Sequence, residues 1–584
     1  MMIYKNYISV LYIDLSSKKI SVKHRQDLCE YLGGVGVASK LLEENIKPQL
    51  HPLDENQPII FAIGAASSIF PVITKTVAMF YSPLTMELGE SYAGGRMAMT
   101  LLFAGYDAVV ITGKSKKPTY LTIKSNNIAF KDARALWGLC TDETGRIIRE
   151  RESGEGKRSI LRIGPAGENL SSFANVCVDT YRHFGRLGLG ALFGSKNLKA
   201  IVTIGDQSIQ IENFKEYFKV YKEIYKKVTE TKLMKKYHDL GTSVNVLPMN
   251  KIGSFPTRNL TENHFEYAEN ISGEKFAQKN LIRKMACTSC PVGCIHIGQF
   301  RREFDEGYEF ESVNVAYDYE LIFALGSYLG INTTDAILEL IEKVEQMGFD
   351  AISTGVVLGW ATESYKKGLI TNDHTIIPLK YGHVKNYIKA VEYMAANTNE
   401  FYKILSKGSY KASQKYGGMD FAVQFAGNET PGYHTGYGSI VGHTVGARHS
   451  HLCNAGYSID QSMEEFDKEK LIEMIFYEER ERCILNSLII CLFARKVYDK
   501  NTILLALNTI GYNLTENDLT TIADKIYKTK LKIKKMLKFD LKNIKLPKRI
   551  FQTPSANGKI DENLAYELIN LYNKKLEAYL NTDL

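Results

Sequence analysis

The chain of 584 residues is too long for one hydrophobic core, so we expect two to four domains. Its hydrophobic content of 45% and charged content of 24% exclude a disordered or fibrous protein. The formal net charge of +8 suits an acidic partner, and because no motif for reading nucleic acid is present, we expect a small acidic redox protein rather than a nucleic acid.

The cysteines and the N-terminal residues indicate a compartment. Nine cysteines are scattered along the chain rather than paired, which is typical of a reducing environment. The first residues contain no apolar signal-peptide stretch, and no apolar run reaches the roughly 18 residues of a membrane helix. We therefore expect a cytoplasmic protein that does not interact with a membrane.

Short apolar runs bounded by turn residues dominate the first two hundred residues and predict strands. These runs are Tyr7–Asp14, Lys19–His24, Pro58–Gly64, Thr76–Tyr81, Ala108–Thr112, Tyr120–Lys124, Ile128–Lys131, Ser159–Ile163 and Ala200–Ile204.

Beyond Asp206 the apolar residues recur at helical spacing, which predicts mainly helices. The clearest are Phe214–Tyr237, Thr333–Met347, Asp467–Asn486 and Asp561–Leu580. The lysines of Lys525–Lys538 predict a solvated helix face, and the glycines and histidines of Gly427–Gly456 predict a loop. The fold class is therefore α+β, with a sheet-rich domain at 1–207 followed by mainly helical domains at 208–415 and 416–584.

Three thiols at C-x-x-C-x-x-x-C spacing, Cys287, Cys290 and Cys294, are the strongest chemical signal. A cubane iron–sulfur cluster is held by four thiolates, so a fourth must come from another segment. By count, Cys483 and Cys491 are both candidates. Zinc remains an alternative, although zinc motifs usually contain two separated cysteine pairs.

Two glycine-rich stretches suggest nucleotide-binding loops, but neither has the required pattern. Gly34–Ser39 lacks the third glycine of the dinucleotide fingerprint. The second stretch, Gly185–Lys196, ends in the order Gly-Ser-Lys, which is not that of a triphosphate-binding loop. This second stretch lies close to Arg182 and contains Arg186, and an arginine can bind two phosphate oxygens at once. It predicts a site for a phosphorylated cofactor other than a nucleotide, with a structural turn as the alternative.

Several ordered blocks together resemble the aldehyde:ferredoxin oxidoreductase family of tungsten or molybdenum bis-pterin enzymes, of which this chain would be a divergent member. The similarity runs nearly from end to end. The matching blocks are Ser82–Thr85, Ala93–Gly95, Phe103–Asp107, Ile163–Leu170, Arg182–Gly190, Gly194–Ala200 and Gly307–Glu311.

The resemblance implies a cofactor at the domain interface, composed of tungsten or molybdenum held by two pterins, with magnesium bridging the pterin phosphates. It also implies a [4Fe–4S] cluster on Cys287, Cys290, Cys294 and a fourth thiol, for which the spacing of Asn486–Phe493 selects Cys491. The implied cofactor-binding residues are Lys75, Tyr92, Ala93, Gly94, Gly95, Arg182, His183, Gly185, Glu345, Phe349, Asp350, Arg448, Asn486 and Leu492. The chain departs from the family pattern at Lys75, Tyr92, Glu345, Cys453 and Asn486.

The reaction implied by the resemblance is oxidation of an aldehyde or related carbonyl compound to the carboxylic acid, with electrons passing through the cluster to ferredoxin. Proton transfer would fall to His451 together with Glu309 or Glu311. A homodimer or a complex with an iron–sulfur subunit is compatible with this interpretation. The alternative is an electron-transfer subunit that keeps the cluster but lacks productive pterin binding, and the retained Arg182 and Asp350 favour the enzyme.

Overall fold

Two six-stranded sheets form the N-terminal part of the protein in a computed structural model that describes residues 6–305 and 309–581. The first sheet has the order β2-β1-β6-β3-β4-β5, and only the β1–β6 pair is parallel. Its strands are β1 (Ile8–Asp14), β2 (Ile20–Arg25), β3 (Ile59–Ala62), β4 (Thr76–Tyr81), β5 (Leu88–Ala93) and β6 (Ala108–Thr112).

The second sheet has the order β11-β10-β9-β12-β7-β8, with β7 and β12 parallel. Its strands are β7 (Thr119–Lys124), β8 (Asn127–Asp132), β9 (Arg158–Arg162), β10 (Val176–Val178), β11 (Arg182–Phe184) and β12 (Leu198–Ile204). The two sheets share one core, in which Phe61 of β3 lies 5.5 Å, ring to ring, from Phe184 of β11. The sheet-rich N-terminal region predicted from the sequence is confirmed.

Short helices fill the N-terminal region: α1 (Gly34–Asn45), α2 (Met97–Ala104), α3 (Thr141–Arg151), α4 (Pro165–Glu168) and α5 (Leu189–Ser195). Helix α1 explains the first glycine-rich stretch, because a Cβ on Gly36 would lie 2.3 Å from the carbonyl oxygen of Tyr31. These glycines therefore allow close packing of a helix.

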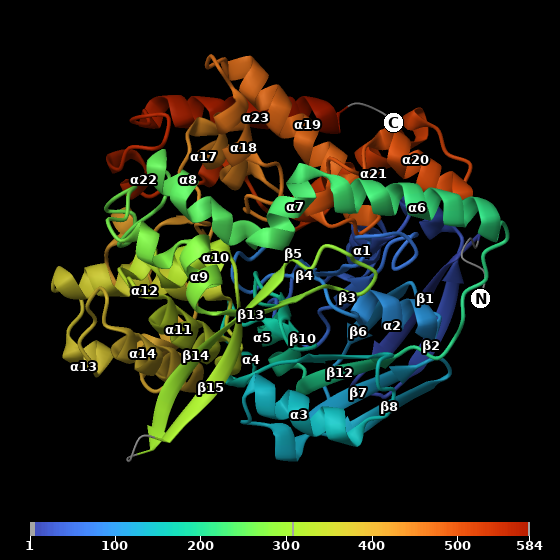
Figure 1. Cartoon of the computed structure of the whole chain (residues 1–584), viewed down its shortest axis with the longest axis horizontal. Helices are drawn as coiled ribbons and strands as arrows, with labels where there is room; N and C mark the ends of the chain where they lie inside the picture. The colour runs from blue at the N-terminus through green and yellow to red at the C-terminus, as the bar shows by residue number, and fades with distance from the viewer. Residues whose placement is uncertain (1–5, 306–308, 582–584) are drawn as a thin grey trace.

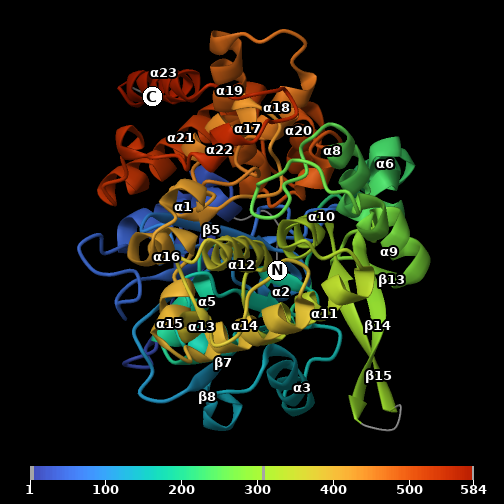
Figure 2. The ribbon, with the colours of Figure 1, turned by 90° about the vertical axis from the view of Figure 1, so that its left-hand side faces the viewer.

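The middle of the chain is mainly helical and includes one hairpin (Figure 1). Its helices are α6 (Phe214–Glu230), α7 (Lys232–Asp239), α8 (Val246–Lys251), α9 (Gly273–Lys279), α10 (Tyr319–Leu325), α11 (Thr334–Met347), α12 (Ala351–Lys366), α13 (Asn372–Thr375), α14 (Val384–Ala396), α15 (Glu400–Leu405) and α16 (Ser409–Tyr416). The antiparallel sheet β13 (Leu281–Met285), β14 (Ile295–Asp305) and β15 (Glu309–Tyr317) ends in a hairpin that projects from the body (Figure 2).

The last part of the chain packs helices over β5 and α1. After the short pair β16 (Gln424–Phe425) and β17 (Asn428–Glu429) come α17 (Tyr437–Val445), α18 (Gly456–Ser462), α19 (Lys468–Ser487), α20 (Lys500–Thr509), α21 (Glu516–Met536), α22 (Arg549–Gln552) and α23 (Glu562–Leu580). Residues buried in one continuous core come from all three parts of the chain. The division at 207 and 415 stays a prediction.

Three local predictions need correction. The single helix predicted at Phe214–Tyr237 breaks at Thr231, whose side chain accepts a hydrogen bond from the N–H of Met234 and so begins α7. The loop predicted at Gly427–Gly456 contains α17, because its apolar side chains are buried. The lysine-rich segment forms part of α21, and it is not solvated throughout, because Lys530 and Lys534 are buried.

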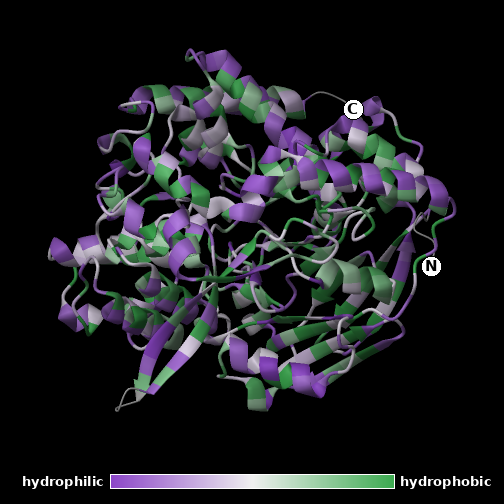
Figure 3. Cartoon of the chain, viewed as in Figure 1, coloured by the Kyte–Doolittle hydropathy of each residue, from purple (hydrophilic) through white to green (hydrophobic). Residues whose placement is uncertain are grey.

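No single helix within residues 6–305 and 309–581 is long and apolar enough to span a membrane. The segments Tyr319–Leu329 and Thr334–Met347 reach the required length and composition only as a pair bent by 108°. Hydrophobic residues concentrate in the inner strands, whereas α6 on the outside alternates between hydrophobic and hydrophilic residues (Figure 3).

Candidate active site

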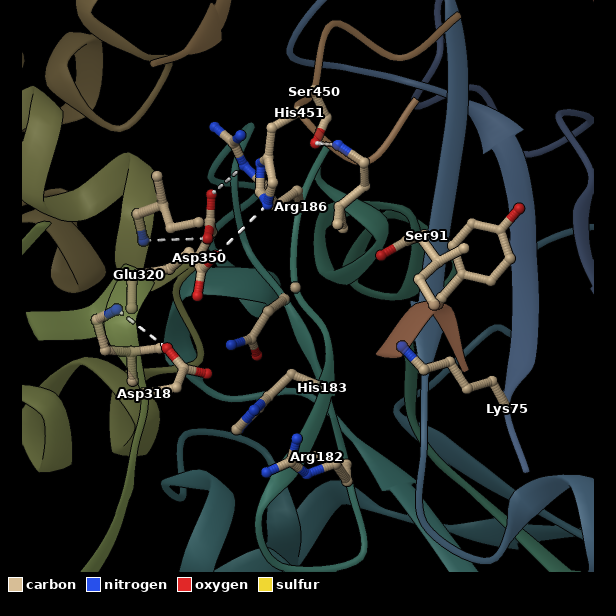
Figure 4. Close-up of a pocket in the computed structure, with 18 of the residues that line it drawn as sticks. Lys75, Ser91, Arg182, His183, Arg186, Asp318, Glu320, Asp350, Ser450 and His451 are labelled. Atoms are coloured by element: carbon tan, nitrogen blue, oxygen red, sulfur yellow. Dashed lines mark hydrogen bonds and ion pairs between the residues drawn. The ribbon is translucent and has the colours of Figure 1, made fainter. Parts of the chain in front are cut away.

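A cavity of about 330 Å³ lies where the N-terminal sheets meet the helical parts of the chain. Figure 4 shows that its walls come from separate segments, with Lys75 on one side, Asp318 opposite, and His451 and His183 between them. The structure brings most of the predicted site residues to this cavity: Lys75, Tyr92, Arg182, His183, Gly185, Glu345, Phe349, Asp350, Arg448, His451, Asn486, Leu492, Cys294 and Cys491.

One wall is built around Arg182 and His183 of β11. The Nε atom of Arg182 is buried and has no hydrogen-bond partner among the described residues. Burial and the neighbouring Arg182 lower the pKa of His183 to about 3, so this imidazole is neutral at neutral pH. Burial raises the pKa of Glu345 to about 8, and its Oε1 lies 3.8 Å from Nε2 of His183. A Cβ on Gly185 would meet nothing within 4 Å, so this part of the wall is open.

Arg186 and Asp350 form the adjacent wall. The carboxylate of Asp350 caps α12 by accepting hydrogen bonds from the N–H groups of Ile352 and Ser353. The Nε of Arg186 donates to Oδ2 of Asp350 at 3.2 Å, and its Nη2 donates to the carbonyl oxygen of Glu429 at 2.6 Å. The remaining Nη1 is buried without a partner among the described residues. This arginine is therefore held rigidly with one donor left free for an anion.

The thiol loop, Cys287–Cys294, meets Cys491 through the backbone of Val72. The N–H of Val72 donates to the carbonyl oxygen of Ser289 at 3.0 Å, and the N–H of Cys491 donates to the carbonyl oxygen of Val72 at 3.0 Å. The pKa of Cys294 is raised to about 12, mainly because the thiol is removed from water and secondly because of the charge of Cys491. The structure thus brings Cys491 to the loop.

The thiols Cys287 and Cys290 are not among the residues that line the cavity. A Cβ on Gly94 would lie 2.5 Å from Sγ of Cys287, so only glycine leaves room for that thiol. Burial raises the pKa of Cys290, and the charges of Cys491, Cys294 and Cys287 add to this effect. No group of three or more His, Cys, Asp or Glu side chains in the described residues is placed to hold a single metal ion.

The other predicted pterin-cradle residues lie beside the cavity. Ala93 ends β5, and Gly95 adopts φ +100°, a conformation that favours glycine. The carbonyl oxygen of Gly95 accepts a hydrogen bond from the N–H of Thr288 at 3.2 Å. Ala93, Gly94 and Gly95 therefore place β5 against the thiol loop.

Buried ion pairs hold the segment Arg448–His451. The ring of Tyr92 lies 4.8 Å below the guanidinium of Arg448, and the hydroxyl of Tyr92 donates to Oε1 of Glu90 at 2.7 Å. Oε2 of Glu90 lies 2.6 Å from Nζ of Lys530 on α21. Burial alone would raise the pKa of Glu90, but Lys530 and Arg448 outweigh it and the pKa is lowered.

A second, parallel contact holds His449. Its Nε2 lies 2.7 Å from Oε1 of Glu87, and Oε2 of Glu87 lies 2.5 Å from Nζ of Lys534. The backbone of His449 has φ +53°, which is unfavourable for a residue with a Cβ. The buried ion pairs Glu90–Lys530 and Glu87–Lys534 together anchor the turn that leads to His451.

His451 lies next to a carboxylate that the sequence did not indicate. Its Nε2 is 3.5 Å from Oε1 of Glu320, and the hydroxyl of Tyr433 donates to the same oxygen at 3.0 Å. Burial and the nearby Arg186 lower the pKa of His451, whereas burial raises the pKa of Glu320. Burial and Glu320 raise the pKa of Asp318, which also lines the cavity, to about 7.

The predicted acids Glu309 and Glu311 are not at the cavity. Glu309 is exposed on β15, and the side chain of Glu311 is 43% exposed and pairs with Arg302 at 2.5 Å. Of the motif at 307–311, the first two residues lie outside the described residues. The prediction fails because the strand carries these side chains along the projecting hairpin, and the chain reaches the cavity only at Tyr317, the last residue of β15. The acidic pair Asp318 and Glu320 at the start of α10 was the available signal.

Comparison with known proteins places this chain in a family. The model of the aldehyde ferredoxin oxidoreductase N-terminal domain matches residues 10–205, and the model of domains 2 and 3 of the same family matches residues 219–582. The chain belongs to the aldehyde ferredoxin oxidoreductase family. It is an oxidoreductase of this family, and the resemblance found in the sequence is confirmed.

Two members of the family are similar to this chain over nearly their full length, and a third relative over about two thirds. The chain is 31% identical to the tungsten-containing aldehyde ferredoxin oxidoreductase of Thermococcus kodakarensis, covering 95% of this chain and 93% of that protein. Its identity to the protein of the same description from Pyrococcus furiosus is also 31%, with the same coverage. An aliphatic sulfonate oxidoreductase, WOR-like subunit, of Pyrococcus furiosus is 29% identical over 70% of this chain and 66% of that protein.

The fold also occurs in a solved enzyme complex. The structure of the active site complex BamBC of benzoyl coenzyme A reductase with 1,5 dienoyl-CoA matches with a TM-score of 0.83 over 97% of this chain and 94% of that chain. At 19% identity this match supports the family fold and carries no information on substrate.

Proposed function

We propose that this oxidoreductase converts an aldehyde, or a related carbonyl compound, to the carboxylic acid at a tungsten or molybdenum bis-pterin group bound in the cavity. The overall reaction is RCHO + H2O → RCOOH + 2H⁺ + 2e⁻, and a [4Fe–4S] cluster on the four thiols would carry the electrons toward ferredoxin or another small acidic carrier. The family and the printed descriptions of the relatives support this proposal.

The cavity walls fit an anionic pterin group. Arg182 Nε, Arg186 Nη1 and Arg448 Nε are buried donors without hydrogen-bond partners among the described residues. Such donors stabilise phosphate or thiolate negative charge. Glu345 beside His183, and Asp350 beside Arg186, present carboxyl oxygens to the cavity, where ring N–H groups of a pterin would donate. We propose the same binding roles for the lining residues Lys75, His183, Gly185, Phe349, Asn486 and Leu492, and a role in the adjoining backbone cradle for Ala93, Gly94 and Gly95.

The thiols fit a cluster better than a zinc ion. Burial raises the pKa values of Cys290 and Cys294, and such thiols ionise when they bind a metal cation. Cys294 and Cys491 line the cavity. Three of the thiols follow C-x-x-C-x-x-x-C spacing, without the two separated cysteine pairs that are usual in zinc motifs, which favours a cluster. Cys287, Cys290, Cys294 and Cys491 are therefore the proposed cluster ligands.

We assign proton transfer to the pair His451 and Glu320, which lie 3.5 Å apart at the cavity. When bound, the metal–pterin group supplies the centre that takes up two electrons and activates oxygen for attack on the carbonyl carbon. Because the pKa of His451 is lowered, its imidazole is neutral and accepts a proton from the attacking water. Its Nδ1 is buried without a partner among the described residues, so it is available to the reactants. The proton on Nε2 of His451 is then shared with Oε1 of Glu320. The hydroxyl of Tyr433 donates to the same oxygen and fixes the carboxyl group.

The observation that carries the proposal is that one cavity joins the thiols Cys294 and Cys491 to the proton-handling pair His451 and Glu320. The test is metal analysis of anaerobically purified protein together with aldehyde-dependent reduction of a viologen dye. We expect about four irons and one tungsten or molybdenum per chain, with dye reduction. Iron without tungsten, molybdenum or dye reduction would overturn the proposal in favour of an electron-transfer subunit.

A further inference from the structure

The thiol loop lies under two helices at the surface of the molecule (Figure 1). On α7, Nδ1 of His238 lies 2.8 Å from the carbonyl oxygen of Val292 in the loop. On α6, the hydroxyl of Tyr217 donates to the carbonyl oxygen of Ile69 at 2.7 Å, and its ring packs on Phe70 at 5.3 Å. Two residues after Phe70, the backbone of Val72 forms hydrogen bonds with Ser289 of the thiol loop and with Cys491.

The outward face of α6 carries large aromatic side chains in contact with solvent. Phe214 is 61% exposed, Phe218 is 43% exposed and Tyr225 is 42% exposed. Their spacing places them on one side of the helix, and the rings of Phe214 and Phe218 stack at 5.9 Å. Nζ of Lys222 lies 4.3 Å above the ring of Phe218. A row of exposed aromatic residues beside a redox site is typical of a protein interface.

The same two helices are strongly basic. The segment 214–239 contains eight lysines and four acidic residues, so its formal charge is +4 out of +8 for the whole chain. Lys215 and Lys222 have no carboxylate partner within the described part of the chain, although Lys226 and Lys227 pair with glutamates of α6. Residues Cys287 and Cys290 of the adjoining loop are only partly buried, so a bound protein can approach them.

We propose that the outward face of α6, together with the lysines of α7, is the docking surface for a small acidic one-electron carrier protein. The inference rests on the proposed function, because two molecules of such a carrier, each accepting one electron, balance the two-electron oxidation of one aldehyde. Charge complementarity selects this occupant. A second copy of the chain is disfavoured, because a two-fold interface would place the basic face against itself.

Direct binding tests the surface independently of activity. The holoenzyme is immobilised, and binding of a purified acidic ferredoxin is measured at low and at moderate salt. The double variant Lys215→Glu/Lys222→Glu is expected to weaken binding at least ~10-fold at low salt and to reduce its salt dependence. Phe218→Ala is expected to weaken binding at both salt concentrations, because it removes apolar contact area. The matched control is Lys385→Glu/Lys389→Glu on α14, which lies on a distant part of the molecule (Figure 1).

A viologen assay separates failure of this inference from failure of the proposed function. If the wild-type protein reduces viologen with an aldehyde, and the α6 double variant binds ferredoxin as tightly as the wild type, the docking surface is overturned and the function stands. If the wild type does not reduce viologen, the function fails, and the binding assay still decides the surface. A change in oligomeric state caused by the α6 variants, with unchanged ferredoxin binding, would identify an interface between copies and also overturn the inference.

Discussion

Nζ of Lys530 and Oε2 of Glu90 lie 2.6 Å apart, and both side chains are at least 94% buried. The two residues come from opposite ends of the chain, one on α21 and the other on β5. Glu90 in turn positions Tyr92 and Arg448 at the cavity wall. A buried pair of this kind fixes geometry more than it adds stability, because each charge compensates for the desolvation of the other.

The variant Lys530→Met is expected to destabilise the protein by about 3–5 kcal/mol, because it leaves the Glu90 carboxylate buried without its main partner. Lys535→Met, an exposed position on the same helix, should change stability by less than about 0.5 kcal/mol. Adding Glu90→Gln to Lys530→Met should recover much of the loss. Chemical unfolding measures all three, and equal losses for Lys530→Met and Lys535→Met would contradict the assignment.

Replacing Glu320 should affect catalysis, whereas replacing Glu309 should not. Glu320→Gln keeps the size of the side chain but removes the proton-sharing group beside His451, so we expect kcat to fall by roughly 10²–10⁴. Glu309→Gln changes an exposed residue outside the cavity and should leave kcat and its pH profile unchanged. Steady-state dye reduction across pH distinguishes them. A large loss with Glu309→Gln alone would restore the prediction made from the sequence.

Cys491 and Cys483 are expected to differ in their effect on iron content. Cys491 contacts the thiol loop through Val72, whereas Cys483 lies on α19 and donates to the carbonyl oxygen of Glu479. Cys491→Ala should therefore lose most of the cluster, and Cys483→Ala should retain about four irons per chain. Iron analysis and electron paramagnetic resonance of the reduced proteins provide the measurement. Retention of the full cluster by Cys491→Ala would show that another residue is the fourth ligand.

Glu345 should make the cofactor-free protein less stable as the pH rises. Its pKa is about 8 in the folded state, compared with about 4.3 for an unfolded glutamate. Between these values the folded state binds more protons, so stability falls with increasing pH, at up to about 1.4 kcal/mol per pH unit. Between pH 6.5 and 8, Glu345→Gln should flatten this slope, while Glu339→Gln on the same helix should keep it. Thermal unfolding at several pH values measures the difference, and parallel slopes for wild type and Glu345→Gln would contradict the prediction.

Local patterns predicted the regular elements well where one face or both faces are buried. The strands Thr76–Tyr81 and Ala108–Thr112 have the predicted bounds, because continuous apolar runs define strands buried on both faces. The caps Asp467 and Asp561 begin helices as expected, since each side chain accepts a backbone N–H. Thr231 was a less visible signal, because the apolar periodicity continues across it.

The sequence by itself determined the family, the sheet-rich N-terminal region and the helical remainder, because ordered motifs and apolar periodicity are local properties. Only the tertiary structure decided which charged residues are buried. Lys530 and Lys534 resemble surface lysines until β5 and the residue before it place Glu90 and Glu87 against them. Likewise, Glu320 rather than Glu309 faces His451 because the register of β15 brings the chain to the cavity only at its last residue, Tyr317. Ion pairing between distant segments depends on packing, which no local pattern encodes.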